Sequence, residues 1–159
     1  MLIPLRGDFF CLPFGSNGAP YEGMAFPPHG EPAGSPWTAV SSARTGAVTT
    51  LTLELKTRIP VGKVTKTIRL VDGQNAVYTR ERLEGYSLKT SIGHHAILAV
   101  PGKEGSLRIA TSPIRFGMTS PFLFSDPADR EYQSFEIGKR CESLASGTLA
   151  RLSNRFPIS

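Results

Sequence analysis

The sequence predicts an all-β, antiparallel fold, a sandwich with long loops, from the spacing of its apolar residues. Residues 50–56 alternate strictly between apolar and polar side chains, which is typical of a half-buried strand. Residues 64–71 and 76–83 are two further strand segments, and they flank the turn sequence Asp72-Gly73-Gln74-Asn75. We therefore expect a β-hairpin over residues 64–83 as the best-defined local element.

The N-terminal residues 1–47 predict a packed, irregular loop system. Proline and glycine recur too densely there for a helix or a long strand. The segment nevertheless contains large apolar side chains that need burial, and loops of this kind often line binding sites. These side chains are Phe9, Phe10, Leu12, Phe14, Tyr21, Phe26 and Trp37.

The C-terminal half contains weaker signals. Residues 88–100 predict one more strand, which includes two adjacent histidines near its middle. Shorter strands are expected over residues 107–111 and 135–137, a loop over 113–130, and a short helix over 139–152.

Length and composition predict one globular domain over residues 1–159. A chain of 159 residues can bury a core, and 40% hydrophobic with 19% charged residues argues against disorder. No apolar run approaches the ~20 residues that span a bilayer, so no membrane partner is expected. The N-terminus lacks the basic start and long apolar stretch of a signal peptide, which predicts a cytoplasmic protein.

The net charge of +5 comes from basic residues that are scattered through the predicted strands. Nucleic-acid-binding proteins usually show a concentrated basic stripe or a known motif, so no nucleic-acid partner is expected. A solvated basic sheet face is the simpler interpretation of these residues. They are Lys56, Arg58, Lys63, Lys66, Arg69, Arg80 and Arg82.

All three histidines lie in two short segments that contain glycine and apolar residues. An imidazole can move a proton near neutral pH, which makes these segments the first candidates for a functional site. His29 follows two prolines that fix the backbone and precedes Gly30, which permits a ligand to approach closely. A surface histidine in a proline-stiffened turn is the alternative.

The adjacent residues His94 and His95 are expected to point to opposite faces of their strand, so only one of them faces a cleft. For the same reason they do not readily share one metal ion. Zinc sites need three or four convergent ligands, and the sequence has no HExxH motif or Cys/His cluster. No metal and no cofactor are therefore expected.

Four segments in order resemble the galactose mutarotase-like group, whose best-known members are aldose 1-epimerases. The segments are residues 6–15, His29-Gly30-Glu31 with Trp37, residues 72–78, and residues 93–96, and together they cover about residues 6–100. The resemblance implies a large antiparallel β supersandwich that binds sugars in a cleft on one sheet. Enzymes of this group interconvert the α and β anomers of a free sugar. In them a late glutamate takes the proton of the anomeric hydroxyl while a histidine protonates the ring oxygen.

The resemblance also assigns candidate residues. His29 matches the histidine of the group's loop, and His95 or His94 matches the histidine of its strand. We favour His95 because it directly precedes Ala96-Ile97-Leu98. His29 and His95 are therefore the expected catalytic residues. The late glutamate has no convincing match, and the candidates by residue type alone are Glu131, Glu136 and Glu142.

Four further residues are candidates for substrate binding: Asp8, Glu31, Trp37 and His94. Glu31 either hydrogen-bonds sugar hydroxyls, orients His29, or is simply solvated. Trp37 either stacks on a sugar ring or closes the core beneath the irregular loops. Asp8 is a candidate acceptor facing the cleft, because aromatic residues follow it.

The chain is shorter than the ~200–250 residues common for sandwich domains of this kind. We therefore expect a supersandwich that lacks material at both ends, with exposed sheet edges that favour a homodimer. Two alternatives to an active epimerase remain open, a non-catalytic carbohydrate-binding module and an inactive fragment of a longer protein. The unmatched glutamate favours the module.

Overall fold

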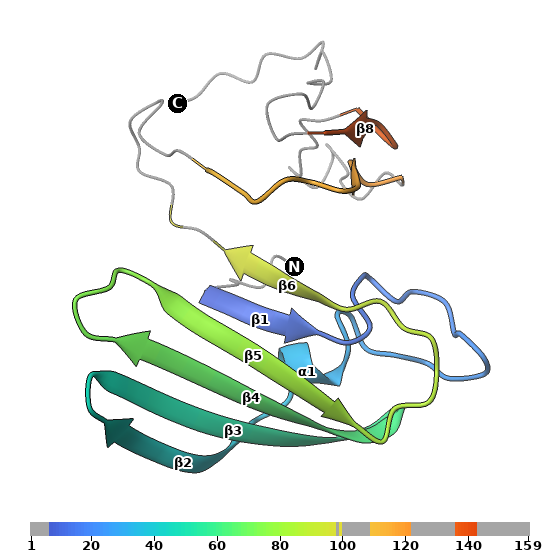
Figure 1. The fold of residues 1–159 in the computed structure, drawn as a ribbon. Helices are drawn as coiled ribbons and strands as arrows, with labels where there is room; N and C mark the ends of the chain where they lie inside the picture. The colour runs from blue at the N-terminus through green and yellow to red at the C-terminus, as the bar shows by residue number, and fades with distance from the viewer. Residues whose placement is uncertain (1–6, 98, 100–108, 122–135, 143–159) are drawn as a thin grey trace, which may run out of the picture. The chain divides into compact units, whose positions relative to one another are not determined.

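The computed structural model describes residues 7–97, 99, 109–121 and 136–142. This part of the chain is mostly β, and its paired strands are antiparallel, as the sequence predicts (Figure 1). The chain divides into two compact units, residues 1–99 and residues 100–159. All three histidines belong to the first unit, so the candidate site is described within it.

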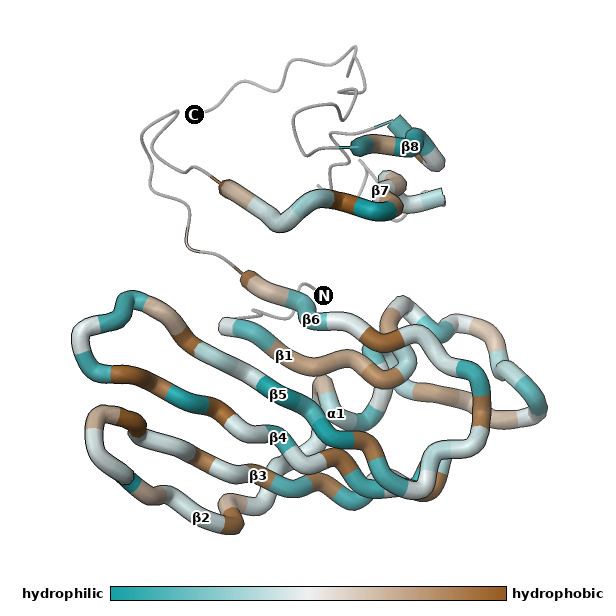
Figure 2. The backbone as a smooth tube through the Cα atoms, in the orientation of Figure 1, coloured by the Kyte–Doolittle hydropathy of each residue, from teal (hydrophilic) through white to brown (hydrophobic). Residues whose placement is uncertain are grey.

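Four strands of the first unit form one sheet in the order β2-β3-β4-β5. These are β2 (Thr38–Thr45), β3 (Val48–Arg58), β4 (Val61–Val71) and β5 (Val77–Glu84). The strand predicted over residues 50–56 is confirmed as part of β3, and the predicted hairpin is confirmed as β4 and β5. Figure 2 shows the alternation of hydrophobic and hydrophilic residues along β4 that predicted it.

The prediction that residues 1–47 contain no long strand is wrong for β2. The dense prolines and glycines end at Pro36, and the eight residues of β2 include neither type, so nothing prevents an extended conformation. All eight residues are exposed, and β2 lies at the edge of the described sheet. Short elements also occur earlier, because Gly7–Cys11 form β1 and Glu31–Gly34 form the single helical turn α1.

Strand β1 pairs antiparallel with β6 (Gly93–Ile97) in a second, two-stranded sheet. The strand predicted over residues 88–100 is therefore shorter than expected at its N-terminal end. In the register of this pair, Phe9 lies opposite His95 and Phe10 lies opposite His94. Directly opposed residues share a face, so the two histidines point to different faces of the two-stranded sheet.

The core of the first unit lies between the two sheets. Phe10 and Leu12 pack there with Val64 of β4, and the partly buried side chains of Trp37, Leu83 and Tyr86 surround them. Lys66 is also buried, with 7% of its surface exposed. Its assignment to the solvated basic face is wrong, because strand alternation places it on the same face as Val64.

The described part of the second unit contains one short antiparallel pair, β7 (Gly117–Met118) with β8 (Arg140–Cys141). The helix predicted over 139–152 is wrong where it can be checked, since residues 140–141 form β8; residues 143–152 lie outside the described residues. Residues 109–111 and 136–137 are not in strands, while residues 107, 108 and 135 lie outside the described part. Residues 113–121 form a loop around β7, and the remainder of that predicted loop lies mostly outside. No helix within the described ranges has the length and apolar character that a membrane span requires.

Candidate functional site

His29 and His95 lie in contact although they are far apart in the sequence. Their ring centroids are 5.1 Å apart and the rings are nearly perpendicular, at 84°. His95 is presented by β6, and His29 comes from the loop that precedes α1. The structure therefore brings together the two residues that the sequence predicts as catalytic.

Two phenylalanines surround this histidine pair. Phe9 stacks on His95 with 4.7 Å between ring centroids, because the two residues are direct cross-strand partners. Phe14 meets His29 edge-on at 5.5 Å and lies 6.2 Å from His95. The imidazoles thus stand in a largely aromatic environment, which removes part of the surrounding water.

The backbone at His29 is held in an uncommon conformation. Its φ angle is +58°, in the left-handed region, and its N–H donates to the Gly15 carbonyl at 2.8 Å. Its own carbonyl accepts a hydrogen bond of 3.1 Å from the Leu12 N–H. Gly30 follows with a φ of +76°, and a Cβ atom at this position would lie 1.8 Å from the Leu12 carbonyl oxygen. Glycine is therefore required beside His29.

The environment of His29 favours its neutral form. Burial lowers the pKa of His29 below its ordinary value of 6.5, and the nearby His95 lowers it further because two adjacent positive charges repel. The Nδ1 atom of His29 is buried and has no hydrogen-bond partner among the residues that the structure describes. A neutral imidazole in this position is suited to accept a proton or a hydrogen bond from a bound hydroxyl.

This pKa shift predicts a dependence of stability on pH. Because the pKa of His29 is lower in the folded than in the unfolded chain, the unfolded chain binds more protons as the pH falls below about 6.5. Folding stability should therefore decrease below about pH 6.5. In His29→Gln this contribution is absent, so its free energy of unfolding should fall less than the wild type's between about pH 7.5 and pH 5. Urea titrations at both pH values measure the difference, and parallel pH curves would contradict the shift.

His94, on the other face, is hydrogen-bonded to carboxylates at both ring nitrogens. Its Nδ1 lies 2.7 Å from Asp8 Oδ2, and its Nε2 lies 3.1 Å from Glu81 Oε2. The predicted division of the adjacent histidines between two faces is confirmed by these contacts. His94 and Asp8, both predicted to bind substrate, bond to each other on the face away from His29.

Behind His94 lies a buried ion pair that was not predicted from the sequence. Lys66 Nζ stands 3.5 Å from Glu81 Oε1, and each side chain is only 9% exposed. This distance is at the limit for a hydrogen bond, and Glu81 Oε1 accepts none from the described residues. Lys66 also lies over the Trp37 ring, 5.9 Å from its centroid. The alternation of β4 was the available signal, because it places Lys66 between Val64 and Ile68 on the apolar face.

Glu31 and Trp37 both have partners within the protein. The Glu31 carboxylate accepts hydrogen bonds from the backbone N–H groups of Arg58 and Ile59, at 2.7 and 2.9 Å. Trp37 donates from Nε1 to the Pro32 carbonyl at 3.1 Å and packs against the core. These contacts attach the segment around α1 to the turn between β3 and β4. This packing agrees with the interpretation of Trp37 as a core residue that closes the irregular loops.

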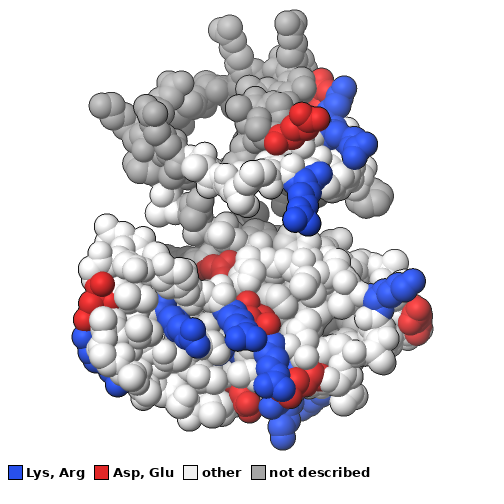
Figure 3. All heavy atoms as spheres, in the orientation of Figure 1, with Lys and Arg blue, Asp and Glu red and all other residues white. Residues whose placement is uncertain are grey.

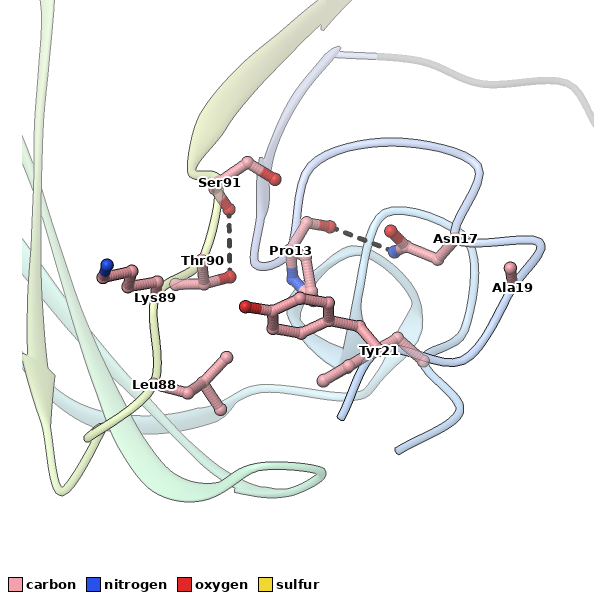
Figure 4. A pocket seen from close by; sticks show the side chains of 9 residues that line it. Pro13, Asn17, Ala19, Tyr21, Leu88, Lys89, Thr90 and Ser91 are labelled. Atoms are coloured by element: carbon pink, nitrogen blue, oxygen red, sulfur yellow. Dashed lines mark hydrogen bonds between the residues drawn. The ribbon is translucent and has the colours of Figure 1, made fainter. Parts of the chain in front are cut away.

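A cavity of about 250 Å³ lies next to the backbone of the Phe14 segment (Figure 4). The Tyr21 ring projects into it between Pro13 and Leu88, whereas the Lys89 side chain extends away from that ring. Asn17, which also lines the cavity, donates hydrogen bonds to the carbonyls of Pro13 and Pro27 and so connects these two segments. Neither His29 nor His95 lines this cavity.

The candidates for the late glutamate lie in the second unit. Glu136 forms an ion pair with Lys139 at 3.1 Å, and Glu131 lies outside the described residues. Within the described residues of the first unit, no carboxylate hydrogen-bonds to His29 or His95. Among all residues that the structure describes, no three His, Cys, Asp or Glu side chains are grouped so that they could hold a metal ion.

Comparison with models of protein families, with curated proteins and with solved structures finds no match to this chain. What the fold and the site define is therefore a mostly β, antiparallel protein with two adjacent imidazoles among aromatic side chains. A functional assignment has to come from the chemistry of this histidine pair.

Proposed function

We propose that the protein is an aldose 1-epimerase-like member of the galactose mutarotase-like group and binds a sugar at His29 and His95. The observation that carries this proposal is the contact between the two imidazoles, 5.1 Å apart, beside Phe9 and Phe14. The apolar C–H face of a sugar ring packs well on aromatic side chains, and imidazole nitrogens bind its hydroxyls. The finer fold assignment, a galactose mutarotase-like β supersandwich, belongs to the same proposal.

The proposed reaction interconverts the two anomers of the bound sugar. One group takes the proton of the anomeric hydroxyl while another gives a proton to the ring oxygen, and the bond between the anomeric carbon and that oxygen breaks. The resulting aldehyde rotates and the ring closes again, with both protons returned. Neutral His29 suits the proton-accepting role, and His95, which touches it, suits the donating role.

Polarimetry with freshly dissolved glucose and galactose tests this function. We expect the wild type to accelerate mutarotation, and His29→Ala and His95→Ala each to reduce the rate by about 10²–10⁴-fold, the usual contribution of a general acid or base. His94→Gln is the matched control, because it removes an imidazole from the opposite face of the same strand. A loss in His94→Gln equal to that in His95→Ala, at equal stability, would argue against the assignment.

A non-catalytic sugar-binding module is the second candidate. It is favoured by the lack of a hydrogen-bonded carboxylate at either imidazole within the described residues, since an acid without its partner base loses most of the rate advantage. In this case calorimetry should detect sugar binding that His29→Ala and His95→Ala weaken, without any change in mutarotation rate. Neither binding nor acceleration would exclude both functions.

A further inference from the structure

The basic residues that are scattered in the sequence converge on one face of the four-stranded sheet. We call the side opposite Phe10 the outer face; by strand alternation it displays the even-numbered residues of β3 and β5 and the odd-numbered residues of β4. Figure 3 shows a row of Lys and Arg side chains crossing the surface over this sheet. The outer face has six cations, Lys56, Arg58, Lys63, Arg69, Arg80 and Arg82, and two carboxylates, Glu54 and Glu84.

The two carboxylates pair with only two of the six cations. Lys63 lies 3.3 Å from Glu54 and 3.1 Å from Glu84, and Arg82 lies 3.3 Å from Glu84. Within the described part of the chain, the remaining four cations form no ion pair. They are Lys56, Arg58, Arg69 and Arg80, and all four are exposed.

Arg69 and Arg80 are close neighbours on the outer face. Arg69 lies opposite Tyr78 and Arg80 lies opposite Thr67, so the two arginines are diagonal partners on adjacent strands. Such positions are about 7–8 Å apart and within reach of long side chains. Like charges at this distance repel each other and reduce the stability of the sheet. A bound anion between them would remove the repulsion and accept hydrogen bonds from both guanidinium groups.

A block of hydroxyl groups adjoins these arginines. Thr52 and Thr67 are cross-strand partners, and each lies two residues from another threonine of the same face, at Thr50 and Thr65. Hydroxyls both donate and accept hydrogen bonds, and the spacing of about 6.6 Å along a strand and 4.8 Å between strands forms a flat polar grid. A grid of hydroxyls bordered by unpaired cations matches the hydroxyls and acidic groups of a charged sugar polymer.

We propose that the outer face binds an acidic polysaccharide, with Arg69 and Arg80 contacting its carboxylate or sulfate groups. This site is separate from the His29–His95 pair, and it does not depend on the function proposed there. Single-stranded nucleic acid fits less well, because sheets that bind it rely on several aromatic side chains for base stacking. On the outer face Tyr78 is the one aromatic among the described strands, and its hydroxyl donates to Gln74.

Binding to heparin, a sulfated polysaccharide, tests the proposal. We expect Arg69→Gln/Arg80→Gln to weaken heparin binding by about tenfold or more, since two hydrogen bonds to charged groups are lost. Arg44→Gln/Lys89→Gln removes the same charge at exposed positions of the first unit that are not on this face, since Arg44 lies opposite Thr49 on the other face and Lys89 lies in the loop after β5. This control should change the affinity by less than about threefold, as expected of charges outside the site that are screened by salt. Equal losses in the two double variants would show attraction by net charge alone and overturn the proposal.

A second measurement does not depend on the folding of any variant. Phenylglyoxal modifies exposed arginines, and peptide mapping of the wild-type chain should show that heparin protects Arg69 and Arg80 but leaves the reactivity of Arg44, on the other face, unchanged. No protection at Arg69 and Arg80 would overturn the proposal. Tighter binding to single-stranded DNA than to heparin, at equal ionic strength, would also overturn it and favour a nucleic-acid partner.

Discussion

Lys66→Met is expected to lower the free energy of unfolding by about 3–5 kcal/mol, the usual effect of removing one partner of a buried ion pair. Methionine fills a similar volume, but it leaves the Glu81 carboxylate, whose side chain is 9% exposed, without a cation. The carboxylate then has His94 as its remaining hydrogen-bond partner among the described residues. Urea unfolding of the wild type and the variant measures the loss.

Lys63→Met is the matched control, because it makes the same substitution three residues earlier on the opposite face. Lys63 also pairs with glutamates, but its side chain is 35% exposed, so its removal should change stability by about 0–1 kcal/mol. Lys66→Met/Glu81→Leu removes both buried charges and should recover much of the stability. If Lys66→Met and Lys63→Met lower the free energy of unfolding by similar amounts, burial of the ion pair is not the cause of the loss.

Lys66 is also connected to the strand that presents His95, through a series of side-chain contacts. Contacts run from Lys66 on β4 to Glu81 on β5, then to His94 on β6 and Asp8 on β1. They connect the four-stranded sheet with the two-stranded sheet, which presents His95 on its other face. His94 therefore belongs to the contacts between the two sheets, and neither of its ring nitrogens is available for a ligand in this arrangement.

The hairpin of β4 and β5 could be predicted from the sequence because its signals are local. Alternating side chains define each strand, and the turn residues between them define the connection. Strand β2 is not predicted, because residues 1–47 as a whole are rich in proline and glycine, although the last proline within that segment is Pro36. The position of Lys66 differs from the prediction because alternation along β4 divides the basic residues between two faces and places Lys66 beside Val64.

The candidate site could be predicted only in part. Strand alternation requires that His94 and His95 point to opposite faces, whatever the tertiary structure. Which of them meets His29 depends on the register between β1 and β6, in which Phe9 lies opposite His95. That register joins segments far apart in the chain, and no local pattern specifies it. The contacts of Glu81 with Lys66 and His94 could not be predicted for the same reason, since both partners lie on other strands.

A substitution in the loop that presents His29 should lower the free energy of unfolding as much as the loss of Lys66 from the buried ion pair. Gly30→Ala is expected to lower the free energy of unfolding by about 3–5 kcal/mol, from backbone strain together with steric overlap. The φ angle of +76° is unfavourable for alanine, and the new methyl group would start 1.8 Å from the Leu12 carbonyl oxygen. That carbonyl belongs to the segment that hydrogen-bonds to His29, so the overlap should displace the imidazole as well.

Substitutions at two other glycines distinguish the cost of backbone strain from the cost of steric overlap. Gly23 has the same φ of +76°, but a Cβ atom added there would meet no atom within 4 Å, so Gly23→Ala should cost only about 1–2 kcal/mol, the effect of strain alone. Gly34 has neither a positive φ nor a close neighbour, so Gly34→Ala should change stability by about 0.5 kcal/mol or less. Urea unfolding of the three variants should therefore rank them Gly30, Gly23, Gly34. If Gly30→Ala loses no more than Gly23→Ala, the close approach of Leu12 to Gly30 does not hold the His29 loop in place.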